Sequence, residues 1–376
     1  MESRLSPQKK LGNFSNIVIG ALLAFSFFIL IQFFNKTDVY HQHFFDHGKI
    51  WIAYNVCRSF FALFIIWILY ATGNVILNIP HYRDSLSQFT LSERIVLSFG
   101  IGAAIWHIGL FILGEANLYY QTIMLAICLC ILAISGSALK QVIGESIQNL
   151  PARTQTGRIA ILPIISGAAI FIALAWLLVI RGLYVGGGGD YFTHYFYYYQ
   201  NMVKNHGLAP NDVWYHYYYS KGAGLYFLGI LLTDPEAPQL ITFCFVAIAA
   251  LSLKALITRI NPRSIWPLVC PLLYILYNLI GLSDNGGEFQ KIHEETTALV
   301  VICTWAISMY NLNPTEWRKP IFLMLATIMV AGAILTQAFV VFFAFFFAAA
   351  LMIALIKRNW LNVRFYFFLG LISFIS

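Results

Sequence analysis

Charged residues are scarce in this sequence of 376 residues, where Asp, Glu, Lys and Arg together make up 10%. A water-soluble domain usually carries about a quarter of such residues. This chain has too few to cover a water-exposed surface, and 60% of its residues are hydrophobic. The composition therefore excludes an ordinary soluble globular domain.

Cysteines with the spacing of a metal or redox site are also lacking. All six lie inside apolar runs, and we interpret them as small hydrophobic residues (Cys57, Cys128, Cys130, Cys244, Cys270 and Cys303). The net charge of +7 comes from Lys and Arg scattered over short loops, without the basic face that nucleic acid requires. We therefore expect no nucleic-acid partner.

Long apolar runs are abundant, and strand-like alternation is absent. Runs of roughly 18 residues or more span the hydrocarbon core of a bilayer as helices. The sequence predicts an all-α, polytopic transmembrane helical bundle of about ten or eleven spans. We place the spans at 14–34, 51–77, 95–113, 118–138, 160–181, 237–257, 265–282, 297–312, 320–337, 338–356 and from near 363.

The basic residues predict the orientation of these spans. Every even-numbered loop is basic, as is the N-terminus, so these parts are predicted to be cytoplasmic and the odd loops external. We read the first run as an uncleaved anchor. The last run stops at Ser376 without a polar flank, so we expect a truncated form of a longer protein. We divide the chain into a four-span region, 1–158, and a second membrane region, 159–376.

The longest predicted external loop, 182–236, is rich in Tyr and Trp and carries most of the candidate chemistry. Asp190 follows four glycines and is placed to cap an interfacial helix. A polar stripe along that helix includes His194 and Tyr197, and the helix is expected to end near Gly207. A second short helix is predicted around 224–232. The connector between them holds Tyr218 and Lys221, which suit a lipid phosphate at headgroup depth.

A span followed by Gly-Gly-Gly-Gly-Asp190, with His194 one turn later, resembles the first external loop of the GT-C glycosyltransferase superfamily. The resemblance is to the protein mannosyltransferase and aminoarabinose transferase branch, and it covers roughly 160–356. It implies a polytopic enzyme that uses polyprenyl-phosphate-linked sugars, with Asp190 as the acidic residue of the site. The chain departs from the family pattern in lacking a second acid beside Asp190 and in carrying four spans before the first catalytic one.

The other candidate loop, 283–295, is dense in ionisable groups. On a helix, Glu288, Lys291 and Glu295 share a face. Two interpretations stay open. The loop is a solvated segment with an internal Glu–Lys pair, or Glu288 or Glu295 faces Asp190 across a cavity and completes the site. By contrast, His107 within the third span is expected to be a packed core histidine.

The resulting hypothesis is an inverting transferase acting on the non-cytoplasmic side. Asp190 is the expected general base on the acceptor hydroxyl, and Lys221 and Lys204 are expected to neutralise the leaving phosphate, with Tyr218 beside them. His194 and Glu295 orient the acceptor or hold a divalent cation, Mg or Mn, for which Asp190 and His194 are the candidate ligands. The alternatives are a transporter or flippase for an amphipathic solute, or a non-catalytic part of a larger assembly.

Overall fold

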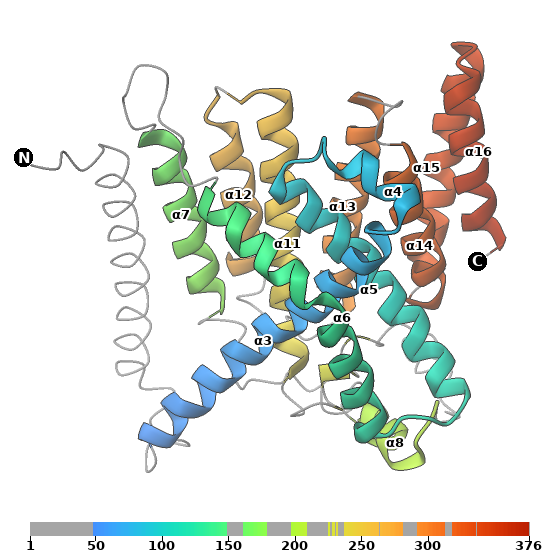
Figure 1. The fold of residues 1–376 in the computed structure, drawn as a ribbon. Coiled ribbons are helices and arrows are strands. Elements are labelled where there is room, and N and C mark those ends of the chain that lie inside the picture. Colours follow the sequence, from blue (N-terminus) through green and yellow to red (C-terminus); the bar gives the residue numbers. More distant parts are fainter. Residues whose placement is uncertain are drawn as a thin grey trace, which may run out of the picture.

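The computed structural model describes residues 48–148, 161–178, 197–208, 225, 228–229, 231, 237–262, 264–280, 292–312, 318–335 and 337–375. Across these residues the regular structure is helical, with no strand (Figure 1). The helices are α3 (Gly48–Leu77), α4 (Pro80–Leu86), α5 (Leu91–Glu115), α6 (Gln121–Gln148), α7 (Ile161–Leu177), α8 (Tyr197–Asn205), α11 (Ala237–Ile260), α12 (Trp266–Ile280), α13 (Ile292–Leu312), α14 (Arg318–Leu335), α15 (Gln337–Ile356) and α16 (Trp360–Ile375).

The predicted all-α class is therefore confirmed for the described part of the chain. Each apolar run predicted from 51–77 onward coincides with one of these helices, and the run at 14–34 lies outside the described residues. Within the described ranges, two helices, Leu91–Glu115 and Leu240–Ile260, are long and apolar enough to cross a membrane. A third candidate is the bent pair of Leu63–Leu77 and Pro80–Leu86.

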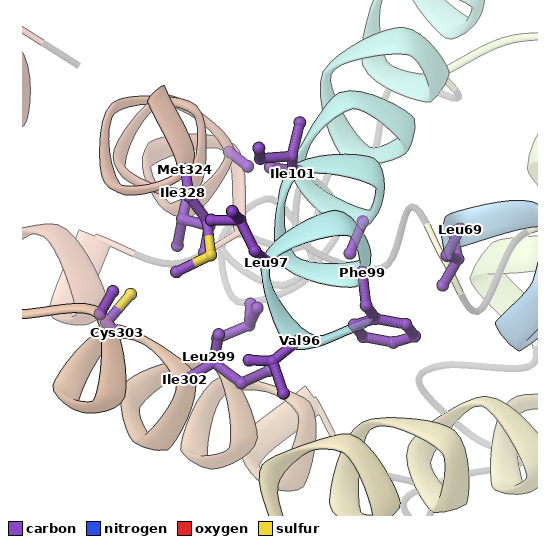
Figure 2. Packing of buried hydrophobic residues seen from close by; sticks show 14 of the residues in the cluster. Leu69, Val96, Leu97, Phe99, Ile101, Leu299, Ile302, Cys303, Met324 and Ile328 are labelled. Carbon is purple, nitrogen blue, oxygen red and sulfur yellow. The ribbon is translucent and has the colours of Figure 1, made fainter. Parts of the chain in front are cut away.

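Helix α5 lies at the centre of the core. Its apolar side chains pack against α13 and α14 on one side and against α3 and α11 on the others. Figure 2 shows Val96, Leu97 and Phe99 of α5 beside Ile302 of α13 and Met324 of α14. His107, on the same helix, is buried as expected. This one core includes residues from both sides of position 158.

The crossing of α3 and α5 depends on two glycines. A Cβ on Gly102 would collide with the carbonyl group of Leu69, and a Cβ on Gly73 with the carbonyl of Ser98. The two backbones therefore touch directly, as they do in membrane helix pairs held together by small residues. Beside the crossing, the indole N–H of Trp106 donates to the hydroxyl of Thr72 over 3.0 Å.

Helix α4 turns sharply away from α3. The axes of Leu63–Leu77 and Pro80–Leu86 meet at 107°, and Pro80 begins the second helix, where its missing N–H costs nothing. Leu86 is buried, whereas His81 and Arg83 are exposed. The sequence pattern did not predict this helix.

Candidate functional site

The candidate site is built around α8, the described helix of the long loop 182–236. The C-terminal end of α8 docks on the turn between α5 and α6, at the lower edge of Figure 1. Backbone hydrogen bonds hold it in place: the Tyr119 N–H donates to the His206 carbonyl over 2.9 Å, and the Leu208 N–H donates to the Gly114 carbonyl over 3.2 Å. Backbone hydrogen bonds thus attach the end of α8 to the α5–α6 turn, although the two segments are far apart in the sequence.

Side chains also stabilise the contact between the end of α8 and the α5–α6 turn. The hydroxyl of Tyr119 is buried and donates to the Leu110 carbonyl over 2.7 Å. Gly207 packs against the side chain of Asn117, and a Cβ there would also lie 2.9 Å from the Gly114 oxygen. Met202 of α8 is buried in the main core. We call this set of contacts the α8 dock.

Exposed polar side chains lie at the α8 dock. The rings of Tyr120 and His206 stack with centroids 4.0 Å apart and an angle of 16°. His206 Nδ1 lies 3.3 Å from the Tyr119 carbonyl oxygen, which accepts its hydrogen when that nitrogen is protonated. Lys204 is exposed in the last turn of α8, two residues before His206. An exposed ammonium group at the end of a helix can neutralise a phosphate that approaches from outside the protein.

The structure places two residues of the predicted site. Lys204 lies in the last turn of α8, and Glu295 lies in the first turn of α13. The helix expected to end near Gly207 ends at Asn205, and Leu225, Leu228, Gly229 and Leu231 are helical within the range predicted for the second short helix. The other predicted site residues lie outside the described part of the chain: Asp190, His194, Tyr218, Lys221, Glu288 and Lys291. Among the described residues, no group of three or more His, Cys, Asp or Glu is placed to hold a metal ion.

At the opposite end of α5, an ion pair joins it to the end of α11. Glu93 is 1% exposed, and it accepts from Arg259 through both carboxylate oxygens, at 2.9 Å from Nε and 2.8 Å from Nη2. Arg259 Nη2 also donates to the Gln88 carbonyl over 3.1 Å. Glu93 lies at the N-terminus of its helix and Arg259 at the C-terminus of its own, so each charge is favoured by its helix dipole.

Glu93 was not among the residues singled out from the sequence, although a local signal was present. Thr90 and Glu93 have the spacing of a capping box, and both of its hydrogen bonds are formed. That pattern predicts the start of α5. It does not predict Arg259, whose partner is chosen by the packing of α5 on α11.

Comparison with known proteins adds no relative. No family model, no curated protein and no solved structure matches this chain. Its function is therefore inferred from the residues and the geometry alone.

Proposed function

We propose that this chain is a multi-pass membrane glycosyltransferase that moves a sugar from a polyprenyl-phosphate donor to an acceptor on the non-cytoplasmic side. The proposal includes the predicted ten or eleven spans and the predicted orientation. It also keeps the resemblance of the loop after Gly186 to the GT-C superfamily.

The observation that carries the proposal is the α8 dock. The predicted topology assigns both the α5–α6 turn and the loop 182–236 to the external side, and the dock joins them directly. A loop that carried the site but lay on the opposite side could not make these hydrogen bonds. The dock fixes the Lys204 end of α8 on the α5–α6 turn. This supports a site on the external side, where under the proposal a lipid-linked donor presents its phosphate.

Two further contacts agree with the predicted division of the loops between the two sides of the membrane. The Glu93–Arg259 pair joins the second and sixth predicted loops, both assigned to the cytoplasm. The hydrogen bond from Tyr310 to Asn362, over 3.2 Å, joins the ends of α13 and α16 next to the eighth and tenth loops, which share that assignment. All three long-range connections therefore link ends with the same predicted sidedness.

In the proposed reaction, the acceptor hydroxyl oxygen attacks the anomeric carbon of the sugar. Its proton passes to the Asp190 carboxylate as the new C–O bond forms. The bond from the anomeric carbon to the phosphate oxygen breaks, and polyprenyl phosphate leaves with the electron pair. Lys204 and Lys221 offset the negative charge that grows on this leaving group, with Tyr218 beside them. His194 and Glu295 orient the acceptor or bind a divalent cation. Glu288 and Lys291 contribute to the acceptor site from the loop 283–295.

The test is transfer of labelled sugar from polyprenyl-phosphate donors in reconstituted vesicles. We expect Asp190→Asn to abolish transfer without changing the thermal unfolding of the protein. Lys204→Gln should retain activity with weaker donor binding, because a single exposed cation contributes about 1 kcal/mol, roughly a fivefold change in apparent affinity. Full activity in Asp190→Asn would remove this mechanism. Chelation of divalent cations in the same assay decides the metal dependence.

The transporter alternative predicts ionisable groups near the middle of the spans. In the two long apolar helices, the Asp, Glu, Lys and Arg residues lie toward the ends: Glu93 and Arg94 begin α5, and Lys254 and Arg259 lie in the last two turns of α11. An ionisable group further inside α5 is His107, which is buried in the core. This distribution favours chemistry at the membrane surface. Net movement of donor lipid across vesicles, without sugar transfer, would be the result that supports transport.

A further inference from the structure

The segment from Arg318 onward differs from the rest of the chain in its charge. It contains no Asp or Glu, and its cations are Arg318, Lys319, Lys357, Arg358 and Arg364. Two of them, Lys357 and Arg358, form the turn between α15 and α16, and both are exposed. The segment therefore holds no acidic side chain that could neutralise them.

The turn has a defined backbone. Arg358 adopts a φ of 51°, in the left-handed region that usually selects glycine. Its N–H donates to the Leu355 carbonyl over 3.0 Å, and the Asn359 N–H donates to the Ala354 carbonyl over 3.0 Å, closing the end of α15. The side chain of Asn359 then accepts from the Asn362 N–H over 3.2 Å and caps α16. A long cationic side chain thus occupies a position where glycine would be less strained.

Side-chain contacts bring further cations to the same end of the bundle. The hydroxyl of Tyr310 donates to Asn362, and that of Tyr366 donates to Asn311 over 3.1 Å, so the last turn of α13 is bound to the first turns of α16. Tyr310 also stacks on Phe365 with centroids 3.6 Å apart. Helix α14 begins six residues after α13 ends, which places exposed Lys319 near this end as well.

Next to the cations, on the side of the turn toward the two helices, the surface of the α15–α16 hairpin is apolar. Trp360, the first residue of α16, is 67% exposed, and Ile356, the last residue of α15, is 77% exposed. Further along the two helices, Met352 and Phe367 are also exposed, at about 8 Å and about 12 Å from the turn by helical rise. Exposed Trp next to Lys and Arg, above an apolar face, is typical of side chains at the boundary between headgroups and acyl chains.

We propose that the α15–α16 turn binds the headgroup of an anionic phospholipid, with Lys357 and Arg358 on the phosphate and Trp360 at the base of the headgroup. The acyl chains of that lipid lie along the exposed face of the hairpin. The inference rests on the membrane placement proposed above and not on the transferase reaction.

The experiment measures retention of phosphatidylglycerol by the full chain, by native mass spectrometry from detergent micelles that also contain phosphatidylcholine. We expect wild type to retain phosphatidylglycerol selectively. Each cation near a membrane surface contributes about 1 kcal/mol, so Arg358→Gly should weaken retention roughly fivefold and the pair Lys357→Gln with Arg358→Gly roughly 25-fold. Arg358→Lys should keep most of it.

Arg358→Gly also separates binding from folding. Glycine relieves the positive φ, so this variant should unfold at a temperature equal to or above that of wild type in pure phosphatidylcholine. Arg83→Gln removes an exposed cation from α4, outside the α15–α16 turn, and serves as the matched control, with retention unchanged. Equal retention of the two lipids by wild type, or equal losses in Arg83→Gln and Arg358→Gly, would overturn the inference. Failure of the protein to enter micelles or bilayers would instead contradict the membrane placement, and loss of sugar transfer alone would affect neither conclusion.

Discussion

The direct contact between α3 and α5 makes Gly102→Ala the sharpest test of the fold. The added methyl group would meet the Leu69 carbonyl, with its carbon 2.7 Å away, and the Gly73 nitrogen 3.0 Å away. All three atoms belong to backbone inside a helix, so no side chain can rotate to make room. The helices must separate, and the neighbouring hydrogen bond from Trp106 to Thr72 must lengthen with them.

The magnitude follows from two opposing effects. Inserting a methyl group into a packed core typically costs about 1–3 kcal/mol, and a collision with backbone belongs at the upper end of that range. Alanine in place of a helical glycine gains about 1 kcal/mol from propensity. Gly109 lies on the same helix, and a methyl group added there would have nothing within 4 Å, so Gly109→Ala shows the propensity gain alone. We expect the two variants to differ in free energy of unfolding by about 3 kcal/mol.

The assay is reversible unfolding in mixed micelles, followed by circular dichroism, for wild type and both variants. Gly73→Ala should behave like Gly102→Ala, and the two together should cost less than their sum, because both separate the same pair of helices. A Gly102→Ala protein as stable as Gly109→Ala would refute the close approach of α3 and α5.

Two other contacts yield predictions of the same kind. Removing Arg259 leaves the buried Glu93 carboxylate without its cation. Arg259 is 32% exposed, so water can replace part of the pair. We therefore expect Arg259→Ala to lower the free energy of unfolding by about 2 kcal/mol, less than for a fully buried pair. In a Glu93→Gln background, where the capping box is kept, the same change should cost less than half as much, and equal costs in both backgrounds would rule out the pair. At the α8 dock, Gly207→Ala should speed external proteolysis of the loop 182–236, because its methyl group collides with Asn117. Asn117→Gly removes that side chain at a φ of 55°, which glycine accepts, and should restore part of the protection. Restoration is partial because the new methyl group still lies 2.9 Å from the Gly114 oxygen. Proteolysis that does not slow at all in the double variant would show that the Asn117 contact is not the cause.

The sequence predicted the helices well because the signal for each is local. The apolar run 237–257 and the helix Ala237–Ile260 share their start, and the helix expected to end near Gly207 ends two residues earlier, at Asn205. His107 was also expected in the core, where it lies. The short amphipathic α4 was missed, because its seven residues are too few for a periodic pattern to emerge.

The sequence by itself determined the class of this protein: a chain with 10% charged residues and repeated apolar runs can form only helices that bury or face apolar surroundings. The tertiary structure decided which helices touch. Along a helix such as α5 nearly every side chain is apolar, so no stripe tells which face meets α3, α13 or α14. That choice was made by the absence of a side chain at Gly73 and Gly102, and by the pairing of Glu93 with Arg259 and of Tyr119 with His206. Such contacts join residues far apart in the chain, and they form only when the helices have already been brought together.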